Sequence, residues 1–270
     1  MKKALAILMT MMMVFALAAC GGSKDADQAE TPKTDLEYVK ENGKLVVGIT
    51  DYAPMDYKDA DGNWIGFDAD MARAFAASLG VEVEFQEIDW DNKILELDSK
   101  AIDCVWNGMT LTDEVKAGMN TSNPYCSNTQ MVIVPADKAD QYQTIESLAG
   151  LTFAVESGSA GEDEVEALEY TTIPVKDQAT ALMEVAAGTS DAAVVDSLMA
   201  GAMVGEGTSY ANLTFTIGLN TEEGEEFGVG FRKDSDLAAA LNDFFKAAYA
   251  DGSMMETAEK YGVQAAIIAQ

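Results

Sequence analysis

The chain has 270 residues, with 17 basic and 46 acidic side chains and a formal net charge of −29. Such a polyanion repels nucleic acid and anionic lipid headgroups, so we expect no nucleic-acid partner. The chain contains no histidine, which excludes Ser-His-Asp and Cys-His catalytic groups and every histidine-ligated metal site. We therefore expect neither a metal nor a cofactor.

The N-terminus predicts export. Two lysines precede an apolar run from Ala4 to Leu17, an arrangement that is typical of a signal peptide over residues 1–19 and short for a membrane span. The string from Leu17 to Gly21 resembles a bacterial lipobox, which implies cleavage before Cys20 and a diacylglycerol group on its sulfur. The alternative is an ordinary signal peptide with an incidental cysteine.

The segment that follows, residues 20–34, is polar and free of aromatic side chains. It cannot bury enough apolar surface to fold, so we expect a disordered tether. No later stretch is apolar and long enough to cross a bilayer. The rest of the chain, about 235 residues, suffices for one large domain or two smaller ones.

A first series of alternating strands and helices is predicted from residue 44 onward. The expected elements are strand 44–50, helix 66–79, strand 81–88, helix 92–97, strand 102–106 and a helix that Thr112 caps. This order is typical of a parallel sheet with helices on its faces. Between the first strand and helix, Asp59–Asn63 has acidic spacing like that of a calcium loop, but its glycine is misplaced, which favours a hairpin turn.

A second series then begins. The expected elements are strand 130–134, helix 145–148, strand 151–155, helix 162–168, strand 171–175, helix 179–187, strand 191–195, strand 227–231 and two final helices, 237–249 and 254–261. Two successive open α/β units indicate two similar lobes.

Polar clusters follow the apolar strands, and open parallel sheets bind ligands beyond the carboxyl ends of their strands. These clusters contain Asp51, Tyr52, Asp89, Trp90, Asn107, Gly108 and Thr110 in the first unit, and 156–161 and Asp196 in the second. Facing lobes would bring them into one cleft. Each also has a purely structural explanation: Asp196 as a cap of the following segment, Trp90 as core, and Asn107-Gly108 as a turn.

Seven short segments, in order from about Leu45 to the C-terminus, resemble family 3 of the bacterial extracellular solute-binding proteins, the polar amino-acid type that serves ABC importers. The segments are Val47–Asp51, Gly66–Met71, Asn107–Glu114, Asn123–Tyr125, Ser157–Ser159, Asp191–Asp196 and Lys260–Gly262.

The resemblance implies a two-lobed periplasmic-binding-protein type II fold. Each lobe would be an open, mostly parallel sheet with flanking helices, and a two-strand hinge would join the lobes and bend on closure. Lobe 1 would comprise residues 35–127 and 224–270, and lobe 2 residues 128–223. A monomer is expected, held at the outer face of the cell membrane by the lipid on Cys20, with an ABC permease as its partner.

The resemblance also implies roles for individual residues. Tyr52 and Trp90 would sandwich the ligand, and Asp196 would hold its α-ammonium group. A ligand carboxylate would be held by Asn107, Gly108 and Thr110, with second-lobe contacts from Ser157, Ser159 and Ala160.

One position departs from the family pattern. Val115 stands where the family usually places an arginine for the α-carboxylate, and Lys116 points elsewhere by helix geometry. With Asp51, Glu156 and Asp196, the expected cleft is rich in carboxylates and short of cations. We therefore expect a cationic amino acid or a related amine. The alternative is a neutral amino acid whose carboxylate relies on backbone N–H groups and Thr110.

Other questions stay open at this level. An enzyme on the same scaffold, such as a dehydratase, is an alternative function because paired carboxylates can act as acid and base. A ligand-sensing receptor component is another. Beyond Cys20, only Cys104 and Cys126 are present, either as a disulfide or as two buried thiols.

Overall fold

The computed structural model describes residues 33–220 and 224–270. The expected signal peptide, the expected lipidation site Cys20 and most of the expected tether therefore lie outside the described residues. Within the described ranges, no helix has both the length and the apolar character that a membrane span needs.

The first lobe is built on a six-stranded sheet with the order β4-β1-β5-β13-β6, to which β7 pairs through β13. The strands are β1 (Lys44–Ile49), β4 (Glu82–Glu87), β5 (Cys104–Thr110), β6 (Asn120–Thr121), β7 (Cys126–Asn128) and β13 (Glu225–Phe231). Strands β4, β1 and β5 are parallel, whereas β13 runs antiparallel to β5. The sheet is thus mixed, with a parallel half.

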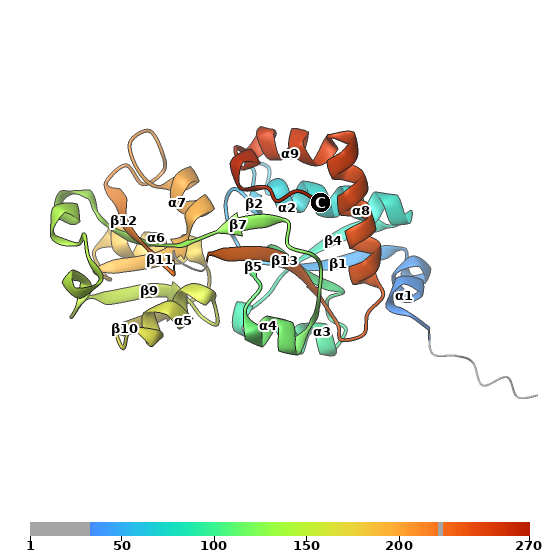
Figure 1. The fold of residues 1–270 in the computed structure, drawn as a ribbon, viewed down its shortest axis with the longest axis horizontal. Helices are drawn as coiled ribbons and strands as arrows, with labels where there is room; N and C mark the ends of the chain where they lie inside the picture. Colours follow the sequence, from blue (N-terminus) through green and yellow to red (C-terminus); the bar gives the residue numbers. More distant parts are fainter. Residues whose placement is uncertain (1–32, 221–223) are drawn as a thin grey trace, which may run out of the picture. The chain divides into compact units, whose positions relative to one another are not determined.

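Helices cover both faces of this sheet, with α2, α8 and α9 on one face and α3 and α4 on the other (Figure 1). The helices are α1 (Asp35–Asn42), α2 (Phe67–Leu79), α3 (Lys93–Asp98), α4 (Asp113–Gly118), α8 (Leu237–Asp251) and α9 (Ser253–Tyr261), with short 3-10 turns η1 (Trp90–Asn92) and η4 (Gln264–Ala266). Apolar residues after Lys44 in β1 are buried because helices lie above and below them.

The segment between β1 and α2 forms a hairpin of β2 (Tyr57–Lys58) and β3 (Trp64–Ile65). The Asp59 carboxylate accepts hydrogen bonds from the backbone N–H groups of Asp61 and Asn63, each at 2.9 Å. The carboxylate thus stabilises its own turn, and the predicted hairpin is confirmed.

The second lobe contains a five-stranded sheet with the order β10-β9-β11-β8-β12. Its strands are β8 (Gln130–Pro135), β9 (Thr152–Glu156), β10 (Thr171–Val175), β11 (Ala192–Asp196) and β12 (Leu213–Leu219). Its helices are α5 (Ala160–Ala167), α6 (Gln178–Ala187) and α7 (Ser197–Met203), with 3-10 segments η2 (Ala136–Gln141) and η3 (Ile145–Leu148). Strands β10, β9 and β11 are parallel, β8 runs antiparallel to β11, and β12 runs antiparallel to β8.

Two connections join the sheets, as expected for a two-strand hinge. The chain leaves the first sheet at β7 and enters the second at β8, then returns from β12 to β13. Strands β7 and β13 pair with each other, with Asn128 opposite Glu225 (Figure 1). The strands that lead into the two crossings are therefore paired on both sides, β7 with β13 in the first sheet and β8 with β12 in the second.

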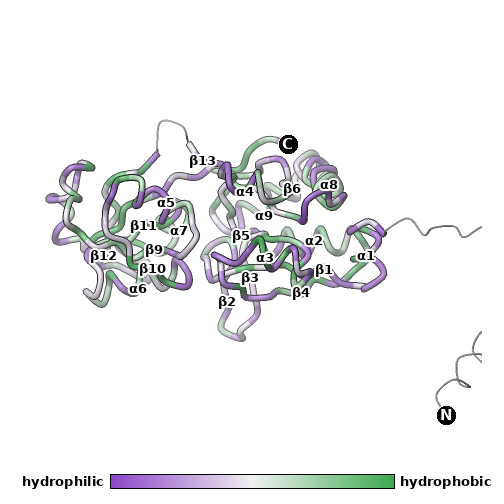
Figure 2. Tube along the Cα trace, turned by 90° about the horizontal axis from the view of Figure 1, so that it is seen from below, coloured by the Kyte–Doolittle hydropathy of each residue, from purple (hydrophilic) through white to green (hydrophobic). Residues whose placement is uncertain are grey.

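Each lobe has an apolar interior, visible in the hydrophobic strands at its centre (Figure 2). In the first lobe Trp106 and Tyr125 pack against Phe245, each with ring centroids 5.5 Å apart. In the second, Phe153 stacks on Tyr170 at 5.9 Å. The thiols of Cys104 and Cys126 are both buried and unpaired, so of the two alternatives the structure has free thiols and no disulfide between them.

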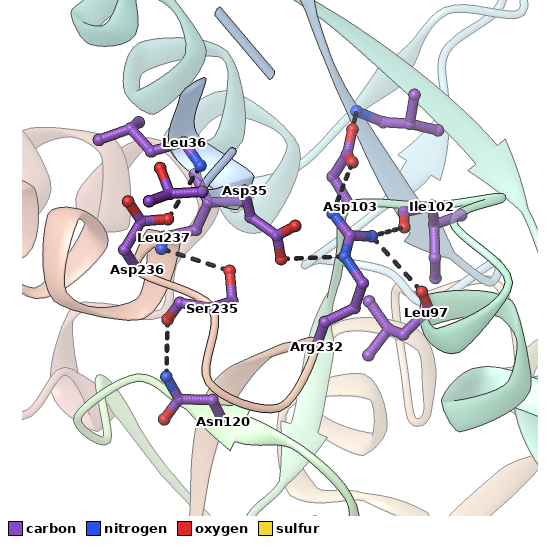
Figure 3. Close-up of polar contacts among 12 residues, drawn as sticks. Asp35, Leu36, Leu97, Ile102, Asp103, Asn120, Arg232, Ser235, Asp236 and Leu237 are labelled. Carbon is purple, nitrogen blue, oxygen red and sulfur yellow. Dashed lines mark hydrogen bonds and ion pairs between the residues drawn. The ribbon is translucent and has the colours of Figure 1, made fainter. Parts of the chain in front are cut away.

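Arg232, just after β13, anchors the end of the first lobe that carries α1 (Figure 3). Its guanidinium group donates to Asp35 Oδ2 at 2.9 Å, Asp103 Oδ1 at 3.0 Å and the Ile102 carbonyl oxygen at 2.7 Å. Asp103 in turn accepts from the Val46 N–H at 3.0 Å. One buried side chain therefore ties α1 to the segment just before β5 and, through Asp103, to β1.

Candidate ligand-binding cleft

A polar cleft lies between the two lobes, at the carboxyl ends of β5, β9 and β11. Its lining includes eight residues that the sequence singled out: Trp90, Asn107, Gly108, Thr110, Glu156, Ser159, Ala160 and Asp196. They come from both sheets, because the carboxyl ends of the parallel strands in each sheet point to the same gap.

Three further predicted residues lie elsewhere. Asp51 lines a separate groove with Tyr57 and Tyr210, and Ser157 lines another with Lys176. Tyr52 is only 1% exposed, so it packs beneath the cleft and does not form its wall.

Asn107 and Gly108 contribute backbone to the cleft. The Asn107 side-chain oxygen accepts from the Thr50 N–H at 2.9 Å, and its amide donates to Asp56 Oδ2 at 2.8 Å. This side chain is thus committed to the interior of the first lobe. Gly108 has φ +56°, and a Cβ there would lie 2.3 Å from Tyr52 Cε1. Glycine is therefore required where Tyr52 supports the cleft floor.

Asp196 ends β11 at the centre of a buried polar network. Its Oδ1 accepts from Asn128 Nδ2 at 2.5 Å and Gln130 Nε2 at 2.6 Å, and its Oδ2 accepts from Gln178 Nε2 at 2.5 Å. A carboxylate can accept about four hydrogen bonds, so Oδ2 retains capacity for a ligand donor. Burial raises the pKa of Asp196 to about 6, although the Gln178 hydrogen bond opposes the shift.

The side-chain amides of Asn128 and Gln130, which lie where the chain crosses from β7 to β8, also donate to Glu225, a residue of β13. Glu225 Oε2 accepts from Asn128 Nδ2 at 2.9 Å and from Gln130 Nε2 at 2.8 Å, and the Thr110 hydroxyl donates to it at 3.3 Å. The network therefore links Thr110 of the first lobe to Asp196 of the second through both hinge strands. Asn128, Gln130 and Glu225 were not predicted as site residues, because none of them follows a strand whose carboxyl end was expected to form the cleft.

Glu156 is the least satisfied carboxyl group in the cleft. It is 3% exposed, and its Oε1 has no hydrogen-bond partner among the described residues. Burial raises its pKa to about 8, the negative charges of Asp196 and Asp177 add to the shift, and Thr50 and Lys93 only partly offset it. Such a group stays neutral near pH 7 until a cation approaches it.

Ser159 and Trp90, both predicted as ligand-binding residues, also have structural roles. The Ser159 hydroxyl accepts from the Glu162 N–H at 3.2 Å and so caps α5. Trp90 packs with Ile88, Val105 and Val115 in the apolar cluster beneath the cleft. Trp90 is therefore core and cleft wall at once.

Lys93, at the start of α3, also lines the cleft and was missed from the sequence. Its Nζ donates to the Gly158 carbonyl oxygen at 2.9 Å and to the Trp90 carbonyl oxygen at 3.3 Å, and it lies 5.2 Å from the Trp90 ring centroid. The cleft lining thus has one cationic side chain beside the carboxyl groups of Glu114, Glu156, Asp163 and Asp196. Residue 93 lies beyond the polar cluster that follows β4, so the position of the strand end did not identify it. The direction of α3 brings its side chain back to the cleft.

Comparison with known proteins supports the same architecture. The family model described as bacterial extracellular solute-binding proteins, family 3, matches residues 45–264. The arginine-binding extracellular protein ArtP of Bacillus subtilis is 29% identical over 266 residues, covering 97% of this chain and 98% of ArtP. The L-cystine-binding protein TcyJ of Escherichia coli is 31% identical over 232 residues, 84% of this chain and 85% of TcyJ.

Among solved structures, the P235GK mutant of ArgBP from T. maritima superposes with a TM-score of 0.78 at 31% identity, covering 84% of this chain and 98% of that chain. The expected type II binding-protein fold is thereby confirmed. All three of these relatives carry names of binding proteins and none the name of an enzyme.

Proposed function

We propose that this chain, which belongs to family 3 of the bacterial extracellular solute-binding proteins, binds a cationic amino acid or a related amine in its interlobe cleft. It would deliver this solute to the permease of an ABC importer. The observation that carries the ligand class is the pairing of two buried carboxyl groups, Glu156 and Asp196, in one cleft.

The Glu156 Oε1 atom is the main argument for a cation. A buried carboxyl oxygen without a partner is unfavourable unless a ligand donor fills the position. A guanidinium or ammonium group would supply both the donors and the charge, and the neighbouring Trp90 face would add a cation–π contact. The name of ArtP as an arginine-binding protein and the arginine-bound form of ArgBP from T. maritima agree with this ligand class.

A panel of ligands tests the proposal directly. The purified protein would be melted in the presence of arginine, lysine, ornithine, histidine, agmatine, glutamine, cystine and glutamate. A ligand that binds only the folded state raises the melting temperature with concentration. We expect arginine or lysine to produce the largest rise. A response to glutamate with none to the basic compounds would refute the cationic assignment, and a response to glutamine or cystine alone would favour the neutral alternative.

The pH dependence of binding supplies a second test. Because Glu156 has a raised pKa of about 8, a cation that requires its ionised form must displace a proton below that pH. Affinity for arginine should therefore rise with pH, by up to about tenfold per unit between pH 6 and pH 8, and then level off. Calorimetry across this range measures it.

Glu156→Gln is the control for this pH dependence. It removes the titrating group and should leave a much shallower slope between pH 6 and pH 8, because Asp196, with a pKa of about 6, is already mostly ionised there. Lys93, Asp163 and Glu114 also face the cleft, so the comparison of the two slopes isolates residue 156. Equal slopes in both proteins would exclude Glu156 as the proton source.

We also propose that the mature protein is a monomer attached to the outer face of the cell membrane through a lipid on Cys20. Two acyl chains on one cysteine would give stable attachment. Cys20→Ser should move the protein from the membrane fraction to the soluble exported fraction, as immunoblots of fractionated cells would detect. Retention in the membrane fraction would contradict the lipid anchor.

A further inference from the structure

Lys93 stands out by its charge. It is the only lysine or arginine that lines the cleft among the described residues. Lys116 lines a different groove with Asp113 and Glu226. Val115, where the family usually has its arginine, is 4% exposed and belongs to the apolar cluster. Any anion that enters the cleft therefore has one cationic side chain to meet.

The ammonium group of Lys93 has no carboxylate partner. Its two hydrogen bonds go to carbonyl oxygens, and no carboxylate of the described residues lies within ion-pair distance of it. An ammonium group has three N–H donors, so one remains for a further acceptor. Burial lowers the pKa of Lys93, while the charges of Glu114 and Glu156 act to keep it protonated.

We propose that Lys93 receives the carboxylate of the ligand and replaces the missing arginine in that role. This assignment rests on the proposed function and narrows it: the cargo is a cationic amino acid with a free carboxylate, not a decarboxylated amine. The charges of the cleft complement such a molecule, with Lys93 for its carboxylate and the Asp196 and Glu156 side chains for its two cationic groups.

The position of Lys93 fits contact with a ligand held between the lobes. Its bond to Gly158 crosses from the first lobe to the turn before α5, and a Cβ on Gly158 would lie 2.8 Å from Asp91 Cα. The lobes are therefore in close contact beside Lys93. A ligand carboxylate near the first turn of α5, in the second lobe, would meet the lysine and the Thr110 hydroxyl, both from the first lobe.

The same bond to Gly158 suggests a competing role, in which Lys93 only holds the lobes together. The two roles differ in how they depend on the ligand. A lobe-to-lobe contact stabilises the closed form with every ligand equally, whereas a carboxylate contact matters only for ligands that carry a carboxylate. Arginine and agmatine, which differ by that single group, separate the two.

Calorimetry with arginine and agmatine on the full chain tests the assignment. The wild-type protein should bind arginine about 100-fold more tightly than agmatine. Lys93→Met should weaken arginine binding about 100-fold and leave agmatine binding within about threefold, and Lys93→Arg should restore most of the arginine affinity. Lys116→Met, the same change outside the cleft, should alter neither.

Other outcomes overturn specific claims. Equal weakening of both ligands by Lys93→Met would show a lobe-to-lobe contact and refute the carboxylate role. Equal affinities of the wild-type protein for agmatine and arginine would also refute the carboxylate role. If neither compound binds but a neutral amino acid does, the cationic proposal fails; Lys93→Met is then measured with that amino acid, and unchanged affinity would also refute the carboxylate role.

Discussion

Asp196→Asn is expected to weaken arginine binding by about 100- to 1000-fold while the ligand-free protein stays folded. The substitution removes the negative charge but preserves size. The asparagine oxygen can keep the two hydrogen bonds that Asn128 and Gln130 now donate to Oδ1, so only the contact with Gln178 must change. The ligand cation, in contrast, would lose a buried, charge-assisted partner.

The matched control is Asp51→Asn, the same chemical change on a half-buried carboxylate in a different groove. We expect at most a few-fold loss of affinity there. Calorimetry gives the affinities, and the melting temperature without ligand checks folding. A loss below about threefold for Asp196→Asn in a folded protein would show that Asp196 does not hold the ligand cation. A large loss for Asp51→Asn would instead place the ligand near Asp51, as expected from the sequence.

Much of this site could be predicted from the sequence because the governing rule is topological. An apolar strand followed by a polar cluster identifies the carboxyl end of a parallel strand, and such ends gather at one edge of the sheet. Trp90 after β4, Thr110 at the end of β5 and Asp196 at the end of β11 were located in this way. The rule needs no knowledge of side-chain direction.

Side-chain direction accounts for what was missed. Tyr52 was expected in the cleft wall, but its loop folds back on itself through hydrogen bonds between Tyr52 and Asp56, which buries the ring. Asn107 was expected to face the ligand, yet the N–H and carbonyl of Thr50 hold its amide in the lobe interior. Both residues lie where the strand-end rule places them and point away from the cleft.

Contacts between elements far apart in the chain could not be predicted from the sequence. Glu225 and Gln130 are 95 positions apart and meet because both hinge strands pass through one region. Nothing in the local pattern of either strand indicates that meeting. Helices α1 and α7 and strand β12 were also not predicted.

The largest stability effect is expected at Arg232, remote from the cleft. Its side chain is 8% exposed and pairs with Asp35 and Asp103, whose side chains are 14% and 5% exposed. Arg232→Met would keep most of the apolar stem but leave Asp103 buried without its cation, and loss of one partner of a buried pair typically costs about 3–5 kcal/mol. For a domain of this size that corresponds to a melting temperature lower by roughly 10 °C.

Lys260→Met supplies the comparison, because Lys260 also pairs with an aspartate, Asp70 at 2.7 Å, but is 61% exposed. Solvent screens such a pair, so its loss should change stability by less than about 1 kcal/mol. Urea unfolding of both variants without ligand measures the two effects. If Arg232→Met loses no more than Lys260→Met, Arg232 does not anchor α1. Because Arg232 is absent from the cleft lining, arginine affinity at low temperature should be unchanged in folded Arg232→Met, which separates its structural role from the binding role of Asp196.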